Sequence, residues 1–172
     1  MVHPLMLVQF TEQPPWESTK EEHAKVMTEV NQAAGTMWAE QMLPGHFTPA
    51  AAAMYGYRNR RTDTLKRKLR DASRGQAILG GTVPNVWSGL MMRAVLASQT
   101  IVARPNRVTI KLFGPRYLYQ FDKRKGQPDK AREITTVASA EVTRLEGEME
   151  RVYVEVFQRN QASKTTSFGG SR

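Results

Sequence analysis

Two stretches of helical periodicity, one near each end of the chain, constrain the fold most. In the first, apolar residues recur at helical spacing until Pro44 and Gly45 interrupt them. This stripe comprises Met27, Val30, Ala34, Met37, Trp38 and Met42. The second stripe comprises Val142, Leu145, Met149, Val152, Val156 and Phe157. The sequence therefore predicts two long amphipathic helices, the first capped by a Ser18/Glu21 capping box and the second opened by Ser139.

A segment rich in β-branched and aromatic residues lies between these helices. It predicts two or three antiparallel strands, at 98–104, 107–113 and 116–121, with turns at Pro105-Asn106 and Gly114-Pro115. The middle strand alternates apolar Val108, Ile110 and Leu112 with polar Thr109 and Lys111. Such alternation is typical of a sheet with one solvent-exposed face. The predicted fold class is α+β, with a small antiparallel sheet packed by the two long helices.

Length and composition indicate one domain. The chain has 172 residues, of which 40% are hydrophobic, enough for a single core. We assign that domain to residues 18–159. The prolines of residues 1–17 favour an extended arm or an added strand. Residues 160–172 lack core material and are predicted to form a flexible tail.

Shorter elements are predicted between the main ones. Thr48-Pro49 favours a short helix that runs to Tyr55 and ends at Gly56. A further helix would bury Leu65, Leu69 and Ala72 on one face. Residues 74–85 are predicted to be a loop and 122–132 a polar connection, whereas MMRAVLA before the strands fits either a strand or a helical turn.

The segment Arg58–Arg74 is strongly basic. It holds eight Arg and Lys against two Asp, and so supplies six of the nine net positive charges of the chain. Such density favours contact with a polyanion or an acidic protein surface, and a solvated helix face is an equally weighted alternative. With the acidic last helix it defines a candidate interaction surface. This surface comprises Arg58, Arg60, Arg61, Lys66, Arg67, Lys68, Arg70, Glu141, Glu148 and Glu155.

Catalytic and metal-binding patterns are weak. His3, His23 and His46 lie in separate regions, and each is interpreted as a surface or packing residue. Gly80-Gly81 lacks the context of a phosphate-binding loop. The chain has no cysteine, which excludes disulfides, and no apolar run near the ~20 residues of a membrane span. We therefore expect a binding or assembly protein that is not an enzyme, with no cofactor, metal or membrane contact.

Nucleic-acid binding is the main alternative function. Tyr55 and Tyr57 accompany the basic segment, and RYLYQF adds further aromatic residues that could stack on bases. No sequence signature of a known RNA- or DNA-binding module is present. The alternative is thus a basic protein associated with RNA or the ribosome.

Several segments occur together in an order found in a known family. They are His46-Phe47, YGYRNRR (Tyr55–Arg61) with Leu65 and Lys68, VWSGLMMRAV (Val86–Val95), PRYLYQF (Pro115–Phe121) and EITTVASAEVTRL (Glu133–Leu145). With them the chain resembles the small neck and tail-completion proteins of long-tailed bacteriophages. In that family a Ser/Thr-Gly-x-Leu element starts a sheet, a strand with Tyr follows, and a helix after Glu-Ile closes the chain. Here Ser88-Gly89-Leu90, Tyr117 and Glu133-Ile134 match in order.

The resemblance implies a structural virion protein at the head-tail junction. Such a protein would form a homo-oligomeric ring, contact the head connector and tail proteins, and surround the channel through which double-stranded DNA passes. It would be assembled in the host cytoplasm and end in the virion. We expect the basic segment 58–74 to meet either the acidic last helix of a neighbouring subunit, over Glu141–Glu155, or an acidic ring above or below.

Overall fold

The first long helix, α1 (Lys20–Met37), begins at a capping box made by Thr19 and Glu22. The Thr19 side chain accepts a hydrogen bond from the Glu22 N–H and the Glu22 carboxylate accepts one from the Thr19 N–H, each at 3.2 Å. The predicted box of Ser18 and Glu21 is wrong by one residue, because the same Ser/Thr-x-x-Glu pattern occurs in both registers.

The computed structural model describes residues 6–9, 19–58, 60–75, 85–86, 89–115 and 129–168.

Helical backbone continues past Pro44, although the type of helix changes at Trp38 and again at Leu43. After α1 the chain continues as a π-helical turn, η1 (Trp38–Met42), and a 3-10 helix, η2 (Leu43–Phe47). Pro44 lies in the first turn of η2, where no backbone donor is required. The predicted end of the helix at this proline is therefore corrected to Phe47. Trp38, Met42 and Leu43 are fully buried in the core.

The sheet has three antiparallel strands in the order β1-β3-β2. They are β1 (Met6–Gln9), β2 (Gln99–Arg104) and β3 (Arg107–Leu112). The predicted alternation in β3 is confirmed, because every second residue of this strand is buried. Residues 6–9 form the added strand, one of the two alternatives for the amino-terminal segment. The strand predicted at 116–121 lies outside the described residues.

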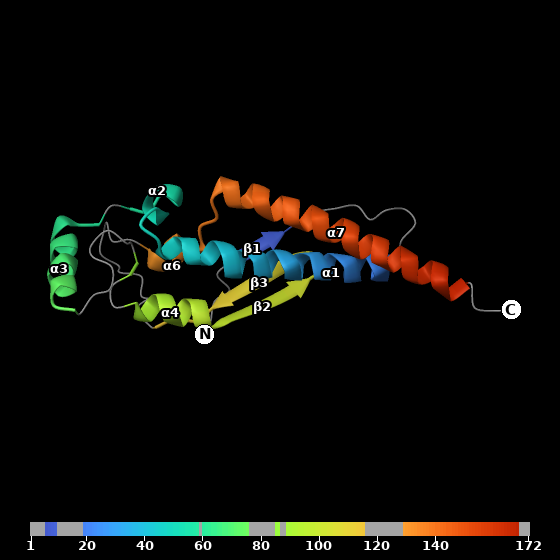
Figure 1. Cartoon of the computed structure of the whole chain (residues 1–172), viewed down its shortest axis with the longest axis horizontal. Helices are drawn as coiled ribbons and strands as arrows, with labels where there is room; N and C mark the ends of the chain where they lie inside the picture. Colours follow the sequence, from blue (N-terminus) through green and yellow to red (C-terminus); the bar gives the residue numbers. More distant parts are fainter. Residues whose placement is uncertain are drawn as a thin grey trace.

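The last helix, α7 (Ser139–Phe168), packs along α1, whose other side contacts β2 and β3 (Figure 1). The core contains Leu145, Met149 and Val156 from α7, whereas Val142 of the predicted stripe is 43% exposed. The α+β fold is confirmed, with α1 as the helix that covers the sheet. Helical backbone continues to Phe168, so the predicted flexible tail is wrong for 160–168, a stretch without Gly or Pro.

Four shorter helices complete the described structure. They are α2 (Ala51–Met54), α3 (Thr62–Ser73), α4 (Leu90–Ala97) and α6 (Lys130–Thr135). The ambiguous MMRAVLA segment is helical and belongs to α4, so Gly89-Leu90 leads into a helix and not into a strand. The helix α6 is not predicted by the sequence, and its first residues lie in the segment 122–132 that was expected to be a polar connection. The Asp129 side chain caps α6 by accepting a hydrogen bond from the Arg132 N–H at 3.0 Å.

Gly35 allows α1 to approach the sheet closely. A Cβ atom at this position would lie 2.7 Å from Val108 Cγ2 and 2.8 Å from Ile101 Cγ2. Both methyl groups belong to β-branched side chains, which have few alternative rotamers. One turn earlier, the buried Asn31 amide donates hydrogen bonds to the carbonyls of Arg104 at 2.7 Å and Pro105 at 3.2 Å. The helix is thus fixed to both the strands and the turn of the hairpin.

Replacing Gly35 with alanine is expected to lower the free energy of unfolding by about 1–3 kcal/mol, since the added methyl group overfills the helix-sheet interface. Gly147→Ala on α7 is the matched control, because a Cβ there meets nothing within 4 Å. Removing a helix glycine should raise stability by about 0.5–1 kcal/mol. Urea denaturation of both variants measures the difference. Equal shifts in the two variants would contradict the close approach.

Candidate functional site

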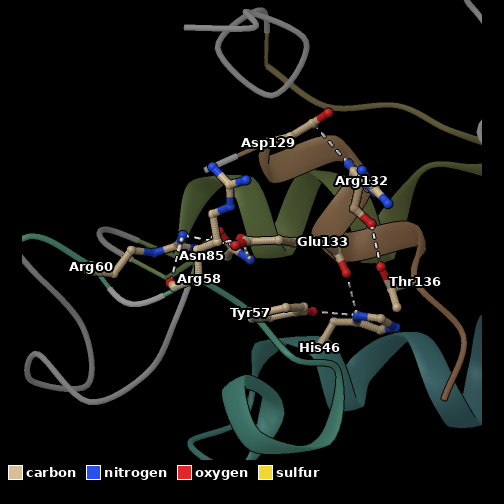
Figure 2. Close-up of polar contacts among 9 residues, drawn as sticks. All are labelled: His46, Tyr57, Arg58, Arg60, Asn85, Asp129, Arg132, Glu133 and Thr136. Carbon is tan, nitrogen blue, oxygen red and sulfur yellow. Dashed lines mark hydrogen bonds and ion pairs between the residues drawn. The ribbon is translucent and has the colours of Figure 1, made fainter. Parts of the chain in front are cut away.

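Polar side chains from five separate segments meet in the interior, on the side of the core next to α2 and α6. We call this set the buried polar network. It comprises His46 from η2, Tyr55, Tyr57 and Arg60 from the segment after α2, Asn85, Glu133 from α6, and Glu141 from α7. Figure 2 shows most of its members.

His46 is completely buried at the centre of the network. Its Nδ1 atom lies 2.5 Å from the Tyr57 hydroxyl and 3.1 Å from the Glu133 carbonyl oxygen (Figure 2). A carbonyl only accepts, so the bond to Glu133 requires the proton on Nδ1. The His46 ring also stacks on Tyr55, with centroids 3.7 Å apart. Of the two interpretations of His46, a surface or a packing residue, the structure shows a packing residue.

Burial keeps the titratable rings of the network neutral. It lowers the pKa of His46 from 6.5 to about 4, against the opposing effect of the Glu133 carbonyl. Burial raises the pKa of Tyr55, with further contributions from the hydrogen bond to Glu141 and its charge. Burial also raises the pKa of Tyr57. At neutral pH the three rings therefore pack as uncharged groups, with the Tyr57 hydroxyl against His46 Nδ1 and the Tyr55 hydroxyl against Glu141.

Arg60 and Glu133 form a bidentate ion pair. Arg60 Nη1 lies 3.0 Å from Glu133 Oε1, and Nη2 lies 2.5 Å from Oε2. The side chains are only 16% and 9% exposed. Asn85 bridges the pair, because its Oδ1 accepts from Arg60 at 2.9 Å and its Nδ2 donates to Glu133 at 3.2 Å (Figure 2). Asn85 has φ 59°, a left-handed conformation that asparagine adopts more readily than most residues.

Glu141 connects the network to the start of α7. The Tyr55 hydroxyl donates to Glu141 Oε1 at 2.6 Å, and the Ala138 N–H donates to Oε2 at 3.0 Å. The second bond satisfies a backbone donor at the helix start, as the acidic residue of a capping box does. Glu141 is 2% exposed. It therefore positions α7 and does not belong to an exposed acidic surface.

The basic helix α3 stands at one end of the molecule, away from the last turns of α7 (Figure 1). Arg61, Lys66 and Arg70 are exposed. Of the three residues predicted to pack, Leu65 and Ala72 are half-buried, but the prediction is wrong for Leu69, which is 55% exposed. Lys68 is instead buried, at 6% exposed. Burial and the nearby Arg60 charge lower the pKa of Lys68. This helix thus presents basic side chains to solvent and turns one lysine inward.

The predicted interaction surface divides into three groups. The exposed cations of Arg58–Arg74 are Arg58, Arg61, Lys66, Arg67, Arg70 and Arg74. Arg60, Lys68 and Glu141 are buried and so do not belong to a surface in this structure. Glu148 and Glu155 pair with Arg151 of their own helix, at 2.7 and 3.1 Å. The structure does not bring α3 and α7 together.

The contacts of Asn85 and Glu133 are not predicted by the sequence, in which Glu133 stands out only as part of the Glu-Ile motif. One available signal was local: an asparagine directly after proline, in a stretch with three glycines, is suited to a left-handed turn. The long-range pairing of Arg60 with Glu133 has no local signal.

Comparisons with protein-family models, with curated proteins and with solved structures found no match to this chain. Within the described ranges, no three His, Asp or Glu side chains gather in a way that could hold a metal ion. Among these same residues, no helix has the length and apolar character needed to span a membrane.

Proposed function

We propose that this chain is a non-enzymatic structural protein of the virion of a long-tailed bacteriophage. In this proposal it forms part of the ring that joins the head connector to the tail and lets DNA pass. It would assemble in the host cytoplasm and remain at the neck of the finished particle. The motif order over His46–Leu145 and the α+β fold with two long helices support this function.

One observation carries the proposal: a basic helix projects at one end of the molecule from a rigidly anchored base. Arg60 lies two residues before α3 and is held by Glu133 and Asn85 in the interior. Of the cations that follow it, Arg61, Lys66, Arg67, Arg70 and Arg74 are exposed, whereas Lys68 is buried. A charged helix with a fixed base is suited to docking, because charge complementarity sets orientation and partner choice. The partner would be an acidic neighbouring ring or the DNA in the channel.

The test reverses the exposed charges of α3 and leaves Arg60 unchanged. The triple variant Arg61→Glu, Lys66→Glu, Arg70→Glu should stay folded, since exposed substitutions change stability by about 0.5 kcal/mol or less each. We expect it to lose the ability to join heads to tails when added to particles that lack the subunit. Circular dichroism checks folding, and electron microscopy counts joined particles. If the variant joins heads to tails as well as the parent protein, the basic residues of α3 form only a solvated helix face.

The nucleic-acid alternative retains one supporting observation, the exposed cations of α3. However, Tyr55 and Tyr57 are each 7% exposed and lie inside the network, so neither can stack on a base. Binding to DNA and RNA at increasing salt separates the two functions. A nucleic-acid protein should show affinity that falls steeply with salt, with a slope set by the number of phosphate contacts.

A further inference from the structure

A second basic surface lies on the face of the sheet that points away from α1. We call it the outer sheet face. It comprises Thr100, Val102 and Arg104 of β2 with Arg107, Thr109 and Lys111 of β3. Arg104 and Arg107 are directly opposite each other, and Lys111 is opposite Thr100. Like charges opposite each other across two strands destabilise the pairing, so this face is suited to an added negative charge.

The described structure supplies no such charge. Neither β2 nor β3 contains an Asp or Glu. The side chains of Arg104, Arg107 and Lys111 form no ion pair with any described residue. Next to the arginine pair, Val102 is 38% exposed. The outer sheet face thus combines unneutralised cations with an exposed apolar residue.

A matching surface lies on α7. Val142, Glu146, Glu150 and Val154 are spaced by four and form one ridge along the helix, which we call the α7 ridge. All four are exposed, the valines at 43% and 46%. Glu148 and Glu155 share an ion pair with Arg151, whereas Glu146 and Glu150 form no ion pair within the described ranges. The ridge presents two carboxylates between two apolar side chains.

The two surfaces also match in spacing. Glu146 and Glu150 are about 6 Å apart along the helix axis, and opposed side chains such as Arg104 and Arg107 begin about 5 Å apart. Val154 follows Glu150 by a further ~6 Å, and Val102 lies about 7 Å from Arg104 along its strand. When the ridge lies along β2, Glu150 and Val154 are opposite Arg104 and Val102. Arg107 lies beside Arg104 on the neighbouring strand, and its long side chain can extend towards Glu146.

We propose that the α7 ridge of one copy docks on the outer sheet face of a second copy. A single subunit cannot make this contact, because α7 packs on α1 and the outer sheet face points away from α1. Two different surfaces that bind each other form a head-to-tail interface, which closes into a ring when the rotation between subunits permits. The inference rests on the ring assembly in the proposed function. It replaces the expected contact of α7 with Arg58–Arg74 and leaves α3 for a different partner.

The test is a charge exchange between two variants. The sheet variant carries Arg104→Glu and Arg107→Glu, and the ridge variant carries Glu146→Lys and Glu150→Lys. Each alone should self-associate at least about tenfold more weakly than the parent protein, because like charges then face each other. Their mixture should recover association, since each acidic surface now finds a basic one. Sedimentation velocity measures assembly, and circular dichroism confirms that both variants fold. Failure of the mixture to recover would overturn the proposal.

Cysteine cross-linking gives a second readout, since the chain has no cysteine of its own. A Val102→Cys variant mixed with a Val154→Cys variant should form a disulfide-linked dimer, whereas Val102→Cys mixed with exposed Met54→Cys should not. Equal cross-linking in both mixtures would overturn the contact. The contact would also be overturned if the sheet variant lost DNA binding while its self-association stayed unchanged. That result would show that the outer sheet face binds nucleic acid. If the interface forms but heads and tails stay unjoined in its presence, the proposed function fails while the interface stands.

Discussion

Replacing Glu133 with alanine is expected to lower the free energy of unfolding by about 3–5 kcal/mol, because it leaves the Arg60 guanidinium buried without its counter-charge. The same change removes the partner of the Asn85 amide. Glu133 joins α6 to Arg60 before α3 and to Asn85. Without its carboxylate, α6 would lose these contacts with both segments. Urea denaturation followed by circular dichroism measures this loss.

Glu148 provides the matched control for Glu133. It also pairs with an arginine, at 2.7 Å, but that arginine is 61% exposed. Glu148→Ala should therefore cost about 1 kcal/mol or less, since solvent screens the pair. The double variant Arg60→Met, Glu133→Leu should recover much of the loss, because it removes both buried charges together. Equal effects of Glu133→Ala and Glu148→Ala would show that burial of the Arg60 pair has no energetic importance.

Acidification from pH 7 to pH 4 is expected to remove about 3 kcal/mol of stability through His46 alone. Burial lowers the pKa of His46 to about 4 in the folded protein, from 6.5. Between these two values the unfolded chain binds the proton and the folded chain does not. The contribution is therefore complete above pH 6.5 and is lost as the pH falls toward 4.

The His46→Phe variant isolates this contribution. Phenylalanine keeps a ring against Tyr55 but does not titrate. The variant will be less stable at pH 7, since the Glu133 carbonyl loses the His46 donor and retains the Thr136 N–H. Its stability should nevertheless fall less between pH 7 and pH 4 than that of the parent protein. Parallel pH profiles for the two proteins, measured by urea denaturation, would exclude His46 as the group responsible.

The elements that repeat a pattern could be predicted from the sequence. The spacing of Val30, Ala34 and Trp38 identified α1, and the alternation of Val108, Ile110 and Leu112 identified β3. Both patterns arise because one side of the element faces the core. α6 has no such stripe and depends on its cap and tertiary contacts, so its short polar sequence resembled a connection.

The candidate site could be predicted only in part, because charge alone does not reveal burial. Arg60 and Arg61 are neighbours of the same type, yet the first is in the buried polar network and the second is exposed. What separates them is Glu133, which lies far along the chain and approaches only after folding. Likewise, Glu141 and Glu148 belong to one helix, but only Glu141 meets Tyr55. Long-range pairings of this kind carry no signal in a single sequence.

The position of β1 at the edge of the sheet affects how the chain folds. The central strand β3 pairs on one side with its sequence neighbour β2 and on the other with residues from the start of the chain. The hairpin can form early, whereas closing the much longer loop to β1 carries a larger entropic cost and should come late. During synthesis on the ribosome, β1 emerges first and cannot pair until β3 has emerged. Until β1 pairs with β3, one edge of β3 is unpaired and another nascent chain can bind to it. Aggregation is therefore most favoured during this interval.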